Sequence, residues 1–128
     1  GGVAEWQSGK DRIRTFRDLV AWQKGMELAR TIYRETERMP RAEQFGLTSQ
    51  MRRAATSVPM NIAEGFGRHT RPELVRGLRI AAGSLMELMT AYELATSMGL
   101  IPERTETLEL LAEADRVLSA LIRSLVNK

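Results

Sequence analysis

The sequence has no cysteine and only one histidine, His69, among its 128 residues. The absence of cysteine excludes disulfides, thiolate metal sites, iron–sulfur clusters and cysteine catalysis within the chain. Glu64 and His69 lie five residues apart, which is not the Glu-x-x-His spacing of di-metal carboxylate bundles. No nucleophile with a partnering base and no cofactor motif accompanies them. The sequence therefore predicts no metal, no cofactor and no catalytic residue, and hence a protein that is not an enzyme.

Long apolar runs are also missing. No stretch reaches the roughly 18 apolar residues that a membrane-spanning helix requires. The first residues do not show the basic and then apolar order of a signal peptide. Together with the absence of cysteine, these features indicate a cytoplasmic protein without a membrane partner. Residues 1–15 are expected to form a poorly ordered N-terminal arm, and residues 16–128 the folded domain.

Proline and glycine divide that domain into four segments. The breaks fall at Met39-Pro40, at Gly65-Phe66-Gly67 and at residues 99–102. Each segment is long enough for a helix of four or more turns, and none shows the alternation typical of strands. Because the connections are short, consecutive helices should be antiparallel neighbours. The predicted fold is an all-α, antiparallel up-down four-helix bundle.

Apolar residues at helical spacing predict the buried face of each helix. In the first helix, at residues 17–38, the stripe consists of Leu19, Trp22, Met26, Ala29, Tyr33 and Thr36, widened by Leu28 and Ile32. The third begins with a Thr70-x-x-Glu73 capping box and carries the most regular stripe, Leu74, Leu78, Ala81, Leu85, Leu88, Tyr92 and Ala95. The fourth, at 103–126, carries Leu108, Leu111, Leu118, Ile122 and Leu125, and is interrupted by Asp115.

The second helix is less regular because Pro59 lies inside its stripe, between Met51 and Ile62. Proline lacks an N–H group and clashes with the preceding turn, at a cost of about 3 kcal/mol unless neighbouring groups compensate. One helix kinked at Pro59 is the favoured prediction, and two helices separated at Pro59 are the alternative.

The net charge of +3 is modest, but basic residues are unevenly distributed. Residues 52–79 carry a net charge of +4, whereas residues 80–128 carry −3. The turn between the second and third helices should therefore be a basic end of the bundle. Arginine grips phosphate through a planar fork of donors, although solubility alone also accounts for surface arginines. The candidate nucleic-acid-binding residues are Arg52, Arg68, Arg71, Arg76 and Arg79.

Several polar residues lie next to positions that should be buried on the second and third helices. They are Arg53, Asn61, Glu64, Ser84 and Glu87. A buried charge is costly unless it is paired, so we expect a polar network in which Arg53 faces Glu64 or Glu87. The network is interpreted as structural or as part of a subunit contact. Small residues at 54–55 and 81–84, with apolar Ile80, Met86 and Met89 off the main stripe, also favour a subunit interface.

Four segments of the sequence resemble a known bacterial family. They are Phe16–Gln23, Gly46–Pro59, the motif Asn61-Ile62-Ala63-Glu64-Gly65, and Ala81–Glu87. The segments are similar to the four-helix bundle proteins also known as 23S rRNA intervening-sequence proteins. The resemblance covers roughly residues 15–126. It implies a four-helix bundle that assembles as a cyclic homopentamer, with no catalytic residue. Related accessory variability determinants of diversity-generating retroelements are more strongly basic and bind nucleic acid and a reverse transcriptase.

Two hypotheses of function follow. In the first, the chain is a non-enzymatic, ring-forming bundle that binds RNA or a ribonucleoprotein partner through its arginine-rich surface. In the second, the oligomer is a structural scaffold for a protein partner and has no nucleic-acid role. An enzyme or small-ligand binder that uses the polar network is the third and least favoured interpretation.

Overall fold

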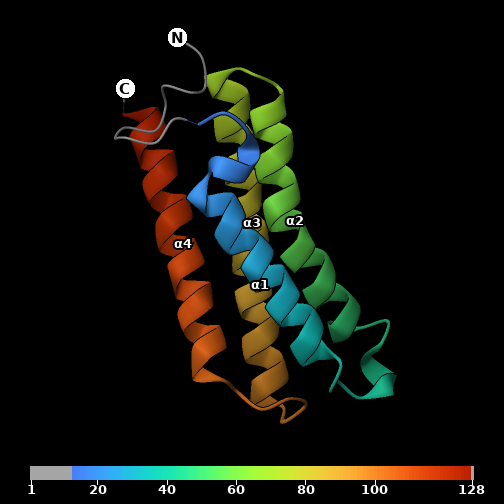
Figure 1. Cartoon of the computed structure of the whole chain (residues 1–128). Helices are drawn as coiled ribbons and strands as arrows, with labels where there is room; N and C mark the ends of the chain where they lie inside the picture. Colours follow the sequence, from blue (N-terminus) through green and yellow to red (C-terminus); the bar gives the residue numbers. More distant parts are fainter. Residues whose placement is uncertain (1–12, 128) are drawn as a thin grey trace.

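The computed structural model describes residues 13–127, in which four α-helices and two short 3₁₀ helices are present and no strand occurs. The elements in chain order are η2 (Phe16–Asp18), α1 (Val20–Thr36), η3 (Arg41–Glu43), α2 (Leu47–Gly67), α3 (Arg71–Ser97) and α4 (Thr105–Val126). Figure 1 shows successive helices running in opposite directions. Each α-helix packs against its neighbours in sequence, and α1 also packs against α4. The predicted all-α four-helix bundle is confirmed.

The described part of the chain begins at Ile13, three residues before the expected start of the folded domain at residue 16. Ile13 is 1 % exposed and belongs to the core. Thr15 begins η2 with a capping box, in which its side chain accepts from the backbone N–H of Arg17 and Asp18 accepts from the backbone N–H of Thr15. The backbone N–H groups of Arg14 and Thr15, which both donate to the Asp18 carboxylate, hold the pKa of Asp18 below its ordinary value. The rest of the expected N-terminal arm, residues 1–12, lies outside the described residues.

The second segment forms one helix, α2, which continues through Pro59. Gly25 of α1 lies opposite this position, and a Cβ atom placed on Gly25 would be 3.1 Å from Val58 Cγ1 and 3.4 Å from Pro59 Cδ. The absence of a side chain at Gly25 therefore lets α1 approach the proline closely, and this packing helps to offset the lost backbone hydrogen bond. The alternative of two separate helices is wrong, and the bend at Pro59 stays a prediction.

The predicted stripes describe the core well on α3 and less well on α1. All seven stripe residues of α3 are buried. On α1 the buried face is centred on Leu28 and Ile32, whereas Trp22 and Met26 are half-buried and Tyr33 is 44 % exposed. On α4 Thr107 is buried in place of Leu108, which is 40 % exposed. None of the helices within residues 13–127 has the length and apolarity needed to cross a membrane.

The closest approach between helices occurs where Gly65 of α2 meets Gly77 of α3. A Cβ atom on Gly77 would lie 2.5 Å from the carbonyl oxygen of Asn61 and 2.9 Å from Cα of Gly65. Both obstacles are backbone atoms, which cannot move aside without displacing the helix. The two glycines therefore allow α2 and α3 to pack backbone to backbone just below the turn that joins them.

This contact predicts opposite effects for the same substitution at two glycines of α3. Gly77→Ala should lower the free energy of unfolding by about 1–3 kcal/mol, because α2 and α3 must separate. Gly83→Ala should be neutral or stabilising by up to about 1 kcal/mol, because a Cβ atom there meets nothing within 4 Å and alanine favours the helix. Urea unfolding followed by circular dichroism measures both, and equal effects of the two substitutions would contradict the packing argument.

Candidate nucleic-acid interface

The predicted basic end lies at the turn between α2 and α3 and on the first turns of α3 (Figure 1). His69 adopts a φ of 65° in this turn. The side chain of Thr70 then accepts a hydrogen bond from the backbone N–H of Glu73 at 3.3 Å and so begins α3. The described contacts include only this half of the predicted capping box. We define the basic end by the exposed or half-buried residues Arg68, Arg71, Arg76 and Arg79.

Two arginines of the basic end are free to bind an anion. Arg76 and Arg79 are exposed, and neither side chain makes a hydrogen bond or an ion pair among the described residues. Arg68 lies 4.0 Å from Glu64, at the limit of an ion pair, and its side chain is 61 % exposed. Arg68 and Arg76 also line the same small cavity of about 90 Å³ between α2 and α3. Arg71 is half-buried and has an interaction partner.

Arg52 does not belong to the basic end. Its Nε donates to Thr36 Oγ1 at 2.8 Å, and its guanidinium lies 4.7 Å from the centre of the Tyr33 ring. Arg52 lies near the beginning of α2, at the end of the bundle away from the α2–α3 turn. Its donors and its planar face hold α2 against α1, so Arg52 lies apart from the other nucleic-acid-binding candidates, and a binding role for it stays a prediction.

The predicted polar network is present only in its uncharged part. The hydroxyls of Ser57 and Ser84 lie 2.8 Å apart and link α2 to α3, and Asn61 Nδ2 donates to Ser57 Oγ at 2.8 Å. The charged members are all exposed: Arg53, Glu64 and Glu87. The Arg53 side chain makes no hydrogen bond or ion pair among the described residues, so the expected pairing with Glu64 or Glu87 is wrong for the single chain. These three side chains project from the outer surface of α2 and α3.

A different polar network, centred on Glu35, is buried between α1, α3 and α4. Glu35 is 8 % exposed, and its carboxylate accepts from the hydroxyls of Tyr92 and Thr107. The backbone N–H of Arg104 donates to Tyr92 Oη at 3.0 Å. Burial raises the pKa of Tyr92 above its ordinary value, the Arg104 N–H partly opposes the shift, and the Glu35 carboxylate adds to it. The position of Glu35, three residues after buried Ile32 and seven after Leu28, was the available sequence signal.

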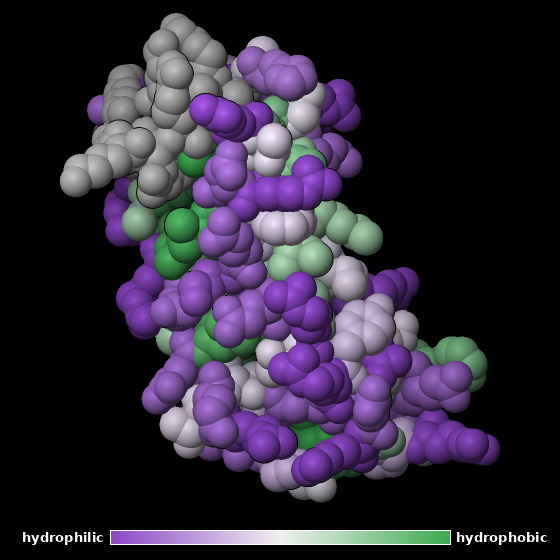
Figure 2. Space-filling model, viewed as in Figure 1, coloured by the Kyte–Doolittle hydropathy of each residue, from purple (hydrophilic) through white to green (hydrophobic). Residues whose placement is uncertain are grey.

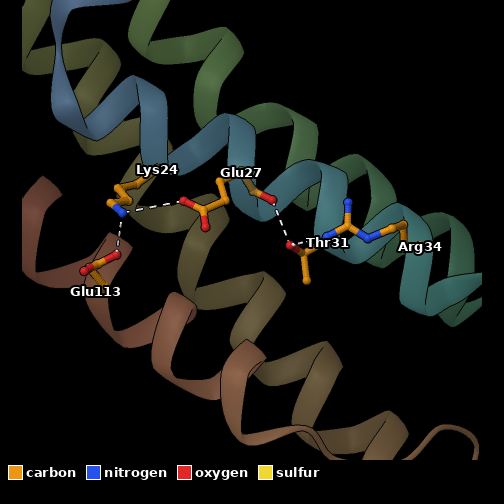
Figure 3. Close-up of polar contacts among 5 residues, drawn as sticks. All are labelled: Lys24, Glu27, Thr31, Arg34 and Glu113. Atoms are coloured by element: carbon orange, nitrogen blue, oxygen red, sulfur yellow. Dashed lines mark hydrogen bonds and ion pairs between the residues drawn. The ribbon is translucent and has the colours of Figure 1, made fainter.

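The seam between α1 and α4 is polar and less tightly packed than that between α2 and α3. Lys24 lies 2.8 Å from Glu113 of α4 and 3.5 Å from Glu27, as Figure 3 shows. The hydrogen bond with Glu113 raises the pKa of Lys24, and Lys24 lowers the pKa of Glu113. Further along, a pocket of about 480 Å³ opens between the two helices, with Arg34 and Arg38 on its α1 side.

An apolar groove of about 550 Å³ runs between α1 and α2 on the outside of the bundle. Its apolar lining comes from Trp22, Met26, Ala29 and Tyr33 of α1 and from Pro59, Met60 and Ala63 of α2. Much of the stripe that the sequence placed in the core thus forms a second apolar surface. In Figure 2, weakly hydrophobic residues break the hydrophilic covering over α2. Arg30 and Arg34 are the charged residues that line the groove.

The described residues bring together no group of three or more side chains suited to binding a metal ion, and His69 lies exposed in the α2–α3 turn. They define a small all-α four-helix bundle with a basic end. The family model of the 23S rRNA-intervening sequence protein matches residues 17–123, and the chain belongs to this family. No curated protein matches the chain.

The Glu35 network predicts unequal effects for the same change at two tyrosines. Tyr92→Phe should lower the free energy of unfolding by about 1–3 kcal/mol, because it leaves one buried Glu35 oxygen and the Arg104 N–H without their partner. Tyr33→Phe is the matched control and should change stability by less than about 0.5 kcal/mol, because Tyr33 is exposed. Chemical denaturation measures both, and a Tyr92→Phe variant as stable as the wild type would contradict the role of the network.

Proposed function

We propose that the chain is a non-enzymatic bundle that assembles into a ring and binds RNA or a ribonucleoprotein through its basic end. The homopentameric size of the ring is taken from the family resemblance. The observation that carries the binding proposal is the pair Arg76 and Arg79, exposed beside Arg68 and without a partner among the described residues. Unpaired guanidinium groups at one end of a bundle offer charge-assisted, forked hydrogen bonds to phosphate.

Assembly explains how a modestly charged chain could bind RNA firmly. One chain carries a net charge of +3, so five copies carry +15. A ring places the basic ends of its subunits within reach of one RNA, and linked weak sites bind more tightly than separate ones. The family is named after an intervening sequence of 23S rRNA, so RNA is the class of partner to test first.

The proposal predicts a salt-dependent affinity that is lowered by substitutions at one end of the bundle. With single-stranded RNA, Arg76→Gln and Arg79→Gln should each weaken binding. Each should also reduce the slope of log K against log salt by about 0.7 for every phosphate that the variant no longer neutralises. Arg41→Gln is the matched control, because Arg41 is exposed on η3 at the opposite end (Figure 1). Fluorescence anisotropy across a salt series measures the slopes.

Equal losses of affinity in all three variants would show that total charge rather than the basic end attracts RNA. Absence of RNA binding by the wild type at low salt would contradict the nucleic-acid role. That result, with an assembled protein, would favour the second candidate, a structural oligomer that binds a protein partner. The observation that supports this candidate is Phe45, a large aromatic side chain that is 91 % exposed between η3 and α2.

A further inference from the structure

The α1–α2 groove is an apolar surface that no other part of residues 13–127 covers. Met60 is 66 % exposed and Tyr33 is 44 % exposed, while Trp22 and Met26 are half-buried beside them. Apolar side chains that cluster in this way on a soluble protein mark a surface that another surface covers. The charged residues in the lining, Arg30 and Arg34, are both basic, so the covering surface should be apolar with acidic residues at its edge.

We propose that this groove binds the outer surface of α3 and α4 of a second copy of the chain, so that copies join head to tail. The inference rests on the proposed function, in which the chain forms a ring. It adds which two surfaces meet.

The hydrogen bonds and ion pairs of the structure identify the complementary surface. On α4, Glu113 faces Lys24 of α1, so the row that contains Leu108 lies on the other flank, toward α3. On α3, Ser84 faces Ser57 of α2, so Met86 lies on the flank toward α4. Met86 is 44 % exposed and Leu108 is 40 % exposed. With exposed Glu93 and Glu109, these residues define the α3–α4 face: Met86, Glu93, Leu108 and Glu109.

The charges of the two surfaces are opposite. Glu93 of α3 and Glu109 of α4 are the exposed carboxylates of the α3–α4 face. The α3–α4 face therefore carries an apolar centre with carboxylates around it, whereas the groove carries an apolar centre with Arg30 and Arg34. Complementary potentials favour this pairing over contact of two identical surfaces, which would bring like charges together.

The two surfaces overlap in height on opposite sides of the bundle. Glu93 and Leu108 adjoin Tyr92 and Thr107, which are hydrogen-bonded to Glu35 near the end of α1, and Met86 lies nearer the level of Ser84. Gly25 lies opposite Val58 and Pro59 of α2, and the adjacent Lys24 pairs with Glu113 of α4. Ser57, next to Val58, is hydrogen-bonded to Ser84 of α3. A heterologous contact between surfaces that overlap in height can add a subunit without displacing it along the bundle axis, which is the condition for a closed ring rather than a rising helix.

The cross-section of the bundle also suits closure. Gly65 and Gly77 bring the backbones of α2 and α3 into contact, whereas a pocket of about 480 Å³ separates parts of α1 and α4. The chain is therefore narrower on its α2–α3 side. Wedge-shaped subunits that join through their two sides form a ring with the narrow side of each subunit at its centre. We therefore expect α2 and α3 to line the centre of the ring. The exposed polar side chains of Arg53, Glu64 and Glu87 then face a hydrated opening.

Complementation between two variants tests the head-to-tail arrangement. Met60→Glu should block the groove and Leu108→Arg the α3–α4 face, and each protein alone should lose assembly and run as a monomer. A mixture of the two should form dimers, because one intact groove and one intact α3–α4 face remain to join the two variants. Phe45→Glu is the control, since Phe45 is 91 % exposed but lies outside both surfaces, and it should leave assembly intact. Native mass spectrometry measures the masses, and circular dichroism confirms that each variant is folded.

The outcomes separate this inference from the proposed function. A wild-type monomer at micromolar concentration would overturn both the ring and the interface. A wild-type oligomer that persists in Met60→Glu and Leu108→Arg would leave the ring standing and overturn the assignment of its surfaces. Monomeric variants whose mixture stays monomeric would also overturn the head-to-tail pairing. RNA affinity of the basic end is measured independently in the monomeric variants.

Discussion

The backbone contact between Gly65 and Gly77 is the constraint on which the other features of the bundle depend. It holds α2 and α3 closer than side chains would allow and fixes them next to the turn that joins them. The same approach brings Ser57 and Ser84 into hydrogen-bonding distance further along the two helices. Because Arg68 and Arg76 flank the glycines, the contact also brings the guanidinium groups of two helices to one small cavity. A packing requirement thus places charge at one end of the fold.

At the end of the bundle away from the α2–α3 turn, a charged residue, Glu35, is buried between α1, α3 and α4. Glu35 joins α1 to α3 and α4 through two hydroxyls, and the Arg104 N–H completes the chain of hydrogen bonds through Tyr92. A carboxylate left without partners in this position would cost several kcal/mol. The hydroxyls of Tyr92 and Thr107 meet that need without a buried cation. The loop between α3 and α4 is thereby attached to the core, so the two ends of the bundle are fixed by different interactions, glycine packing and a polar network.

Helix number, helix order and the core of α3 could be predicted from the sequence, because proline and glycine mark the breaks and the α3 stripe is a single narrow row. On α1 the apolar arc is wide, and spacing alone does not show which edge faces inward. Gly25 and Ala29 decide this, since small residues let α2 approach, and Trp22 and Met26 turn outward. The exposure of Arg53 could have been predicted from helix geometry. Arg53 is adjacent to buried Ala54, but adjacent helical residues diverge by about 100°, so the guanidinium points away from the core.

The arginines of this chain therefore have different physical roles, which the net charge of +3 conceals. Arg52 uses its donors and its planar face on Thr36 and Tyr33, so it stabilises the contact of α1 with α2 and has little left for a ligand. Arg76 and Arg79 have no such partner among the described residues, so their guanidinium groups keep their hydrogen-bond donors for a ligand. Because all basic ends point the same way when copies join at equal height, assembly through the α1–α2 groove would concentrate the unpaired charge on one rim. The apolar groove would thus hold the copies together. The basic ends of the assembled copies would then bind one RNA more tightly than a single basic end does.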